Sequence, residues 1–110
     1  MTINQAAAAL NAEICHDEFN DIELSGAYTS DLLSDVVANA HDSGVLITIQ
    51  AHKNTVAVAT LANIPLIVIC NNRPIPQDML DAAKDEGIAL FRSKENQFTV
   101  SGKIWDLLKT

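Results

Sequence analysis

Short apolar segments alternate with helical patterns at a nearly constant interval along this chain. The apolar segments begin near Ile22, Val45, Leu66 and Ile88. The interval of roughly 22 residues holds one strand, one helix and two short loops, as in repeated β-α units. This alternation predicts an α/β fold built on a mainly parallel sheet.

Two of the apolar segments, residues 45–49 and 66–70, are nearly continuous runs of aliphatic and β-branched residues. Strands of this composition are buried on both faces, whereas a strand with one face in water alternates apolar and polar residues. Residues 88–91 form a weaker run of the same kind, and residues 21–26 alternate, which predicts an edge strand. The expected domain therefore has three layers, with helices on both faces of the sheet.

Apolar residues at helical spacing and capping signals predict five helices. Thr29 or Ser30 is the expected N-cap of the second helix, and the fourth is expected to begin at Pro76 and end at Gly87. The third helix is apolar nearly all round, which predicts burial between the sheet and a partner subunit. The five predicted ranges are 3–15, 30–40, 54–62, 76–87 and 96–108.

A chain of 110 residues fits one domain, and no linker, low-complexity tract or charge block divides it. We expect residues 1–19 to form an N-terminal helix and loop, and residues 20–108 to form the core. Hydrophobic residues make up 48% of the chain. Because a small domain has much surface, some apolar side chains are expected to face a partner, most simply a second copy in a homodimer.

Fourteen acidic residues against seven basic residues give the chain a net charge of -7. Binding to nucleic acid or to anionic membranes depends on clustered Lys and Arg, and the basic residues here are scattered, so neither partner is expected. Cys15 and Cys70 lie far apart and are expected to be reduced thiols. Without a signal-peptide pattern or a long apolar run, we expect a soluble cytoplasmic protein.

The sequence contains no motif typical of a catalytic, cofactor or metal site. It lacks the glycine-rich phosphate loop, the dinucleotide-binding pattern and the nucleophile elbow. No pair of Cys or His residues has zinc-ligand spacing, and the run His16-Asp17-Glu18 is expected to be a solvated loop. We therefore expect no catalytic residue, no cofactor and no metal.

Polar residues gather directly after the predicted strands. In open parallel sheets, ligands bind outside the carboxyl ends of the strands, so these residues form the candidate ligand-binding site. A helix start after the second strand, beside His52 and Lys53, would favour an anion. The candidate residues are Tyr28, Ser30, Asp31, Thr48, Gln50, His52, Asn54, Asn71 and Arg73.

Each candidate also has a structural interpretation. Gln50 and His52 would satisfy the loop backbone and cap the next helix, which is the favoured interpretation. Residues 29–31 would be a plain N-cap, again favoured, while residues 71–73 would hold a phosphate or simply form a turn. Tyr28 would stack on a ring or pack at the rim. As a base or phosphoryl acceptor, His52 would need a matched nucleophile or carboxylate, and none lies nearby in the sequence.

Residues 24–34, Leu-Ser-Gly-Ala-Tyr-Thr-Ser-Asp-Leu-Leu-Ser, resemble the opening of a DRTGG domain, in which a strand and a glycine lead through small residues into Ser-Asp-Leu-Leu. The later elements follow that domain's order, so the resemblance covers residues 20–108. DRTGG domains are similar in fold to the N-terminal domain of HPr kinase/phosphorylase, and also occur in phosphotransacetylases and regulatory pyrophosphatases. The resemblance implies a non-catalytic regulatory or dimerising module.

Two loops depart from that family's pattern. Many relatives carry a Gly-Asp-Arg-like loop after the second strand and a Thr-Gly-Gly-like turn after the third, whereas residues 50–54 read Gln-Ala-His-Lys-Asn and residues 71–73 read Asn-Asn-Arg. Ligand specificity therefore does not carry over from the family. The leading hypothesis is a homodimeric regulatory module that binds a nucleotide or a phosphorylated metabolite. The alternative is a protein–protein interaction module without a small-molecule ligand.

Overall fold

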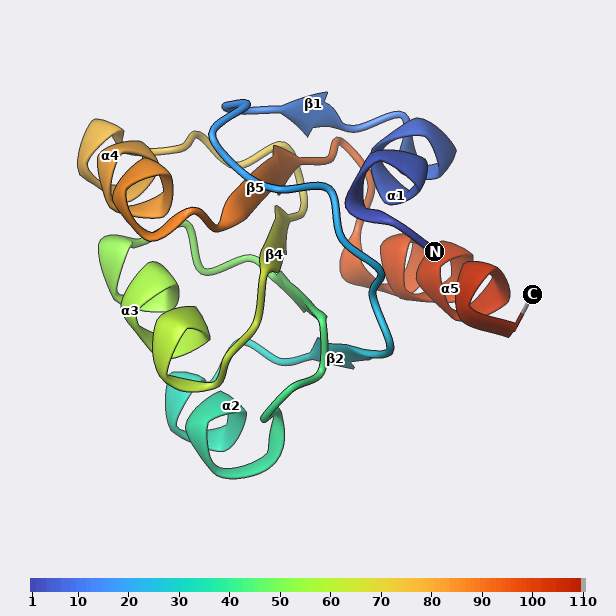
Figure 1. The fold of residues 1–110 in the computed structure, drawn as a ribbon, viewed down its shortest axis with the longest axis horizontal. Coiled ribbons are helices and arrows are strands. Elements are labelled where there is room, and N and C mark those ends of the chain that lie inside the picture. Colours follow the sequence, from blue (N-terminus) through green and yellow to red (C-terminus); the bar gives the residue numbers. More distant parts are fainter. Residues whose placement is uncertain (110) are drawn as a thin grey trace.

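A computed structural model describes residues 1–109, which form five helices and five strands (Figure 1). The helices are α1 (Ile3–Leu10), α2 (Leu33–Asn39), α3 (Lys53–Leu61), α4 (Gln77–Glu86) and α5 (Gln97–Lys109). The strands are β1 (Glu13–Ile14), β2 (Ala27–Thr29), β3 (Val45–Thr48), β4 (Leu66–Ile69) and β5 (Ala89–Arg92). No helix among the described residues is both long and apolar enough to cross a membrane.

All five strands join one sheet in the order β1-β5-β4-β3-β2. Strands β2 to β5 run parallel, with Val45 opposite Leu66 and Leu66 opposite Ala89. Strand β1 pairs with β5 in the antiparallel sense. Parallel neighbours need crossover connections, and α2, α3 and α4 supply them. The predicted mainly parallel sheet is confirmed.

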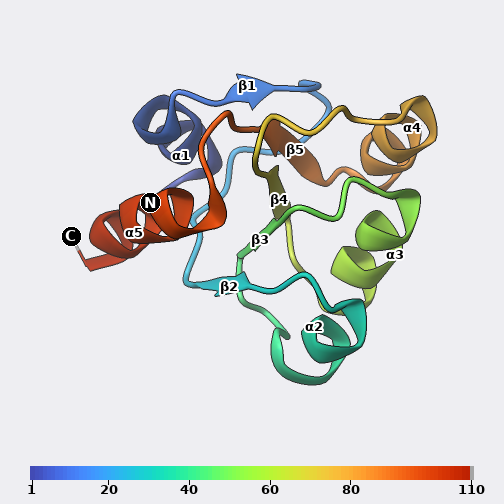
Figure 2. The same ribbon diagram turned by 180° about the vertical axis from the view of Figure 1, so that it is seen from behind.

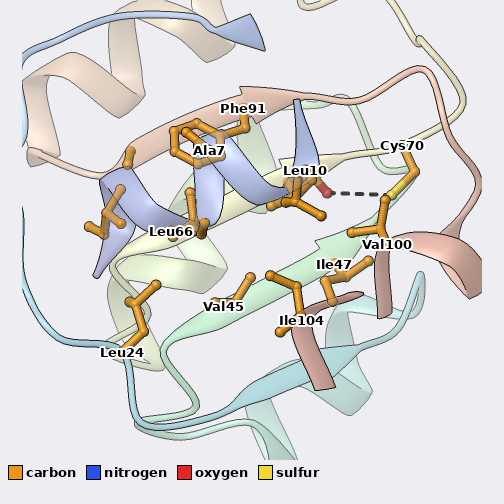
Figure 3. Close-up of a cluster of buried hydrophobic side chains, with 14 residues drawn as sticks. Ala7, Leu10, Leu24, Val45, Ile47, Leu66, Cys70, Phe91, Val100 and Ile104 are labelled. Atoms are coloured by element: carbon orange, nitrogen blue, oxygen red, sulfur yellow. Dashed lines mark hydrogen bonds between the residues drawn. The ribbon is translucent and has the colours of Figure 1, made fainter. Parts of the chain in front are cut away.

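Helices cover both faces of this sheet, which confirms the three-layer α/β architecture (Figure 1). On one face, Ala7 and Leu10 of α1 and Val100 and Ile104 of α5 pack against alternate strand residues such as Val45 (Figure 3). Successive strand residues point to opposite faces, so a strand that is covered twice must be apolar throughout. Every residue of β3 and β4 is indeed buried.

The other face is covered by α2, α3 and α4 (Figure 2). Leu46 and Ile67 of the central strands share an apolar cluster with Val36, Val56 and Met79 from these helices. Each of these five side chains is at most 1% exposed. Because burying a side chain of this size contributes about 1.5–3 kcal/mol, the two apolar layers are the main source of stability.

The boundaries of α4 follow directly from its sequence signals. Pro76 is the N-cap of this helix, and Gly87 is its C-cap with a left-handed φ of 66°. A residue without a Cβ adopts this conformation at little cost, and the next amide, that of Ile88, donates to the Ala83 carbonyl at 3.0 Å. The predicted helix over residues 76–87 is confirmed.

The first parallel strand lies later in the chain than predicted. Residues 21–26, expected to form the edge strand, do not join the sheet, and β2 begins only at Ala27. Their backbone pairs with the N-terminal segment instead, because the Leu24 amide donates to the Met1 carbonyl at 2.7 Å. The alternation in this segment therefore reflects packing of Leu24 under α1 and not a strand of the sheet.

The helix predicted over residues 3–15 ends at Leu10. Asn11 adopts a left-handed φ of 49° as the C-cap of α1, and the chain then forms β1 alongside β5. An ion pair joins these two strands, with 3.4 Å between Arg92 Nε and Glu13 Oε2. A strand of two residues has no periodicity that a sequence pattern could reveal.

Helix α2 begins at Leu33, later than predicted. Its N-cap residue is Leu32, whose side chain makes no hydrogen bond to the first turn of the helix. Thr29 belongs to β2, and the Ser30 hydroxyl accepts a hydrogen bond from the Leu32 amide at 3.2 Å just outside the helix. The Asp31 carboxylate bonds to the end of β3 instead of the helix start. The expectation that residues 29–31 cap this helix was therefore wrong.

Helix α3 lies where it was predicted, but it is not buried all round within this chain. Thr55, Val56 and Ala59 face the interior, whereas Leu61 is 70% exposed. The helix packs against the sheet on one side and against α2 and α4 on its flanks (Figure 2). Its outer side is open in the single chain.

The segment 16–18, expected to be a solvated loop, contains a buried histidine. His16 is 7% exposed, with Nε2 at 2.7 Å from the Ile88 carbonyl and Nδ1 at 3.0 Å from the Glu18 amide. The backbone N–H of Glu18 is a donor, so Nδ1 is the acceptor and Nε2 carries the proton. His16 thus links the chain after β1 to the start of β5.

The amino ends of β2 and β3 meet through backbone atoms. Gly44 has a φ of 87°, and a Cβ placed there would lie 2.8 Å from the Gly26 carbonyl oxygen. The Val45 amide donates to that same oxygen at 3.2 Å. This close approach requires glycine at position 44.

Candidate ligand-binding edge

The carboxyl ends of β2, β3, β4 and β5 meet at one edge of the sheet, and a helix begins beyond each of them (Figure 2). Tyr28 and Thr48 belong to two of these strands, and the other seven candidate residues lie in or next to the loops that follow. The structure brings some of the candidates into contact and separates others.

Asp31 is the centre of a hydrogen-bonded cluster at this edge. Its Oδ1 accepts from the Thr48 hydroxyl and from the Ile49 amide, both at 2.9 Å. Its Oδ2 accepts from the side-chain amide of Gln97 at 3.0 Å. The carboxylate therefore ties the loop after β2 to the end of β3 and to the first residue of α5.

The environment of Asp31 favours its charged form. Partial burial pushes the pKa of this carboxyl upward, but hydrogen bonds from Ile49, Gln97 and Thr48, together with the charge of Arg73, outweigh it and hold the pKa below its ordinary value. Asp31 is thus an anion at neutral pH whose oxygens already have donors. Its role in this arrangement is to order the edge.

Polar side chains also close the loop after β3. Gln50 Nε2 donates to the Asp31 carbonyl at 2.9 Å, and the buried Thr55 hydroxyl donates to the Gln50 carbonyl at 2.7 Å. The Thr48 hydroxyl accepts from the Gln50 amide at 3.1 Å. These contacts confirm the interpretation in which Gln50 satisfies the loop backbone.

His52 is the N-cap of α3. Its Nδ1 accepts from the backbone amide of Asn54 at 3.0 Å, which confirms the capping interpretation. Both side chains are exposed at the edge, so a role for either of them in ligand binding stays a prediction.

Tyr28 and Ser30 belong to a separate polar group centred on Asp35. The Tyr28 hydroxyl donates to both Asp35 carboxylate oxygens, at 3.0 and 2.9 Å, and this hydrogen bond raises the pKa of Tyr28. Hydrogen bonds from Ser30, Asn39 and Tyr28 lower the pKa of Asp35. Tyr28 therefore packs against α2 and does not join the Asp31 cluster.

The turn after β4 is built from two left-handed residues, Asn71 and Asn72, with φ of 61° and 52°. Their amides donate to the carbonyls of Glu95 at 2.9 Å and of Ser93 at 2.8 Å, which holds the loops after β4 and β5 together. The turn interpretation of this segment is confirmed. The Arg73 side chain is exposed beside it, and its role in phosphate binding stays a prediction.

Gln97 completes the Asp31 cluster but was not among the predicted site residues. The two residues are 66 positions apart, so no local motif joins them. The β-α alternation does place the start of the last helix at the same edge as the loop after the first parallel strand. A polar residue at a helix start is too common to single out on that basis.

Three cations at this edge form no close ion pair with the described residues, although the charge of Arg73 acts on Asp31 at longer range. Lys53, Arg73 and Lys94 follow β3, β4 and β5, which are neighbouring strands. Within residues 1–109, none of the three forms an ion pair shorter than 4.0 Å. The edge therefore presents unpaired positive charge in a chain whose net charge is -7.

Residues 35–108 match the sequence profile of a family described as the HPr serine kinase N terminus. This chain belongs to that family. The region of this chain that matches the HPr kinase N-terminus profile begins in α2 and ends in α5. It therefore contains His52 and Arg73 but not Asp31. The resemblance seen in the sequence is confirmed.

The HPr kinase/phosphorylase of Streptococcus uberis is one relative of this chain. The two sequences are 45% identical over 40 residues. The aligned segment is 36% of this chain and 13% of the relative. The chain therefore corresponds to a small part of that enzyme's length.

The fold of this family member is similar to a crystal structure of the CBS and DRTGG domains from the regulatory region of Clostridium perfringens pyrophosphatase, complexed with the activator diadenosine tetraphosphate. The TM-score is 0.74, and the similarity covers 94% of this chain and 45% of that one. Sequence identity is 13%, so this comparison shows a shared fold. It confirms the predicted DRTGG-like architecture.

Proposed function

We propose that this domain is a non-catalytic regulatory module that binds a nucleotide or a phosphorylated metabolite at the carboxyl edge of its sheet, and that it acts as a homodimer. The observation that carries the ligand class is the set of three cations after neighbouring strands that form no close ion pair within residues 1–109, Lys53, Arg73 and Lys94. They follow three neighbouring strands of the sheet. A ligand with more than one phosphate group would be needed to contact more than one of them.

Two helix starts add to the positive potential of the edge. Helices α3 and α4 have nine and ten residues, and their first backbone N–H groups lie at the same edge as the cations. Unpaired N–H groups at a helix start attract anions. Lys53 is the first residue of α3, so a phosphate there would meet both an ammonium group and the helix start.

The relatives support the same ligand class. The pyrophosphatase region that shares this fold is regulatory, and its activator carries four phosphates between two adenosines. The loops after the second and third predicted strands depart from the DRTGG pattern, so the relatives do not indicate which phosphorylated ligand would bind. The observation specific to this chain is its own set of cations.

Two features of the edge favour binding without catalysis. The Nδ1 atom of His52 is engaged in capping α3, and the Asp31 carboxylate already has three donors. A general base needs an available lone pair within reach of the proton it removes.

The homodimer rests on apolar side chains that the single chain leaves in water. Phe98 and Trp105 are 88% and 64% exposed and lie seven positions apart on α5, which puts them on one side of that helix. Exposed apolar groups on one side of a helix are typical of interaction surfaces. The same observation favours the second candidate function, an interaction module without a small-molecule ligand.

Thermal unfolding with a panel of the nucleotides ATP, GTP and diadenosine tetraphosphate tests the ligand. A ligand at 100 times its dissociation constant stabilises by about 2.7 kcal/mol, which raises the Tm of a small domain by several degrees. The rise should be lost in Arg73→Ala and Lys53→Ala and kept in Lys84→Ala, a lysine of α4 remote from the edge. A flat panel would contradict the ligand part of the proposal.

Sedimentation at micromolar concentration tests the homodimer. The native chain should sediment as a dimer, and Phe98→Ser should shift it towards the monomer without lowering the Tm of the isolated fold. The matched control is Thr60→Ser, an exposed position on α3. If the chain is a monomer that binds a ligand, the ligand-binding part of the proposal stands and the homodimer is refuted. If it is a dimer and no ligand raises the Tm, the interaction module is favoured.

A further inference from the structure

A cavity of about 390 Å³ opens between the end of α1, strand β1 and the loop after β5. Its polar lining consists of Asn11, Glu13, Asn72, Arg92, Ser93, Lys94 and Glu95. Pockets for small molecules have volumes of about 300–1,000 Å³, so this cavity suits a small ligand. It lies on the α1 side of the sheet, away from the Asp31 cluster, and shares only Lys94 with the set of cations described above.

Positive charge exceeds negative charge around the cavity. Arg92 and Lys94 line it, and Lys103 of α5 adds a third cation by contacting Glu95 at 2.8 Å. The carboxylates present are Glu13 and Glu95. The charges of the lining itself balance, and Lys103, which lies outside the lining, makes the immediate surroundings of the cavity positive in a chain with a net charge of -7. Such surroundings favour an anion.

The Arg92 guanidinium is only loosely held by its carboxylate partner. Its Nε lies 3.4 Å from Glu13 Oε2, and its terminal nitrogen lies 3.5 Å from Glu13 Oε1. Both distances are long for a charge-assisted hydrogen bond, which is typically 2.7–2.9 Å. The guanidinium therefore has donors to offer to a phosphate, which it can bind with two parallel hydrogen bonds.

Glu95 supplies an acceptor that nothing in the chain uses. Its Oε1 accepts from Lys103, whereas Oε2 is buried and is the one buried side-chain oxygen of the described residues without a hydrogen-bond partner. A carboxylate oxygen that is buried without a donor is unfavourable. Because Oε2 is buried, a ligand hydroxyl would reach it when the Glu95 side chain turns towards the cavity.

We propose that this cavity binds a small sugar phosphate, with the phosphate held by Arg92 and Lys94 and a sugar hydroxyl donating to Glu95. The asparagine amides of Asn11 and Asn72 lie in the same lining and provide further partners for hydroxyl groups. No aromatic side chain lines the cavity, and its apolar part consists of Leu10 and Ala12, so a nucleobase has no ring to stack on. This chemistry selects the sugar phosphate over a nucleotide.

NMR titration of the ¹⁵N-labelled domain with ribose 5-phosphate tests this site, with ribose and inorganic phosphate as comparison probes. We expect saturable shifts of the backbone amides of Asn72 and of residues 92–95. Binding of ribose 5-phosphate should be at least tenfold tighter than that of inorganic phosphate. Equal affinities for the two would overturn the sugar phosphate as the ligand class, and no saturable shift at these amides would overturn the site.

Variants separate this site from the edge of the proposed function. Arg92→Gln and Glu95→Gln should each weaken ribose 5-phosphate binding at least tenfold, while Lys84→Gln and Arg73→Ala should leave it unchanged. The amide shifts outside residues 92–95 report whether each variant keeps its fold. If Arg73→Ala abolished the binding, the ligand would belong to the edge and the cavity proposal would be wrong. A flat nucleotide panel together with ribose 5-phosphate binding would support the cavity and contradict the edge.

Discussion

The side-chain amide of Gln97 donates to Oδ2 of Asp31 at 3.0 Å, across 66 positions of sequence. Oδ1 of the same carboxylate holds the Thr48 hydroxyl and the Ile49 amide. One ionised side chain therefore fixes the end of β3, the loop after β2 and the start of α5 relative to one another. The order of the carboxyl edge depends on this contact.

Replacing Asp31 should loosen that edge. Asp31→Asn keeps one oxygen for Thr48 and Ile49 but turns an amide donor towards Gln97, so we expect a loss of about 1.5–3 kcal/mol in the free energy of unfolding, as for hydrogen bonds to charged groups. Urea unfolding measures it. Asp85→Asn, an exposed carboxylate on α4, is the matched control and should change stability by less than about 0.5 kcal/mol.

The same pair of variants predicts a pH dependence. Because the pKa of Asp31 is lower in the folded state, its contribution to stability is complete above the ordinary aspartate pKa of about 3.9 and is lost as the pH falls through the folded-state pKa. The native domain should therefore lose more stability below pH 4 than Asp31→Asn does. Identical acid profiles for the two proteins would argue against an anionic Asp31.

Removing the cap of α3 should cost less. His52→Ala deprives the Asn54 amide of its acceptor, and loss of an N-cap typically costs about 1 kcal/mol. His52→Asp should restore most of that stability, because aspartate is a good N-cap and complements the helix dipole. His41→Ala, an exposed histidine, serves as the control in thermal unfolding. If His52→Asp were as unstable as His52→Ala, the capping role would be refuted.

Two glycines should respond to alanine in opposite directions. Gly44→Ala forces a left-handed φ on a residue with a Cβ and places that atom 2.8 Å from the Gly26 carbonyl, so we expect a loss of about 2 kcal/mol or more. Gly102→Ala lies in the exposed middle of α5 with nothing within 4 Å of the new atom and should add about 0.5–1 kcal/mol. The two midpoints of chemical unfolding should lie on either side of the native one.

Both thiols should be slow to react in the folded domain. Burial raises the pKa of Cys70, and burial together with the nearby Glu13 carboxylate raises that of Cys15, each from 9.0 to about 11. The thiolate is the reactive form, so at pH 8 alkylation should be about 100-fold slower than for an ordinary thiol. Alkylation by iodoacetamide with and without urea measures this, and equal rates in the two conditions would contradict it.

The raised pKa values of the two thiols also predict how the free energy of unfolding falls at alkaline pH. The unfolded chain loses its thiol protons near pH 9, whereas the folded chain keeps them until about pH 11. The stability that these groups contribute is therefore complete below pH 9 and falls as the pH rises from 9 towards 11. Cys15→Ser should lessen this alkaline loss.

The parts of the fold that the sequence predicted well are those specified by neighbouring residues. The runs that became β3 and β4 are apolar because each is covered twice, and Pro76 and Gly87 define α4 by their own backbone preferences. The residue composition of a segment, and the proline or glycine at its ends, indicate a buried strand or a helix without knowledge of the segments that pack against it.

The parts that were wrong depend on contacts between distant segments. Strand β1 exists because β5 offers it an edge, and the segment before β2 is diverted by its pairing with the N-terminal residues. His16 was expected to be solvated but is buried through its hydrogen bond to Ile88. The β-α alternation predicted that the polar loops share one edge of the sheet, while the Asp31–Gln97 contact could be seen only in the structure.

The contact between Gly26 and Gly44 has a consequence for how this family diverges. That end of the sheet is joined through main-chain atoms, so its chemistry has little freedom to vary. The opposite end is joined by main-chain bonds and also by side chains such as Asp31, Gln50 and Gln97. The exposed polar side chains at that end, such as Arg73, take no part in these bonds and can be exchanged while the framework stays the same.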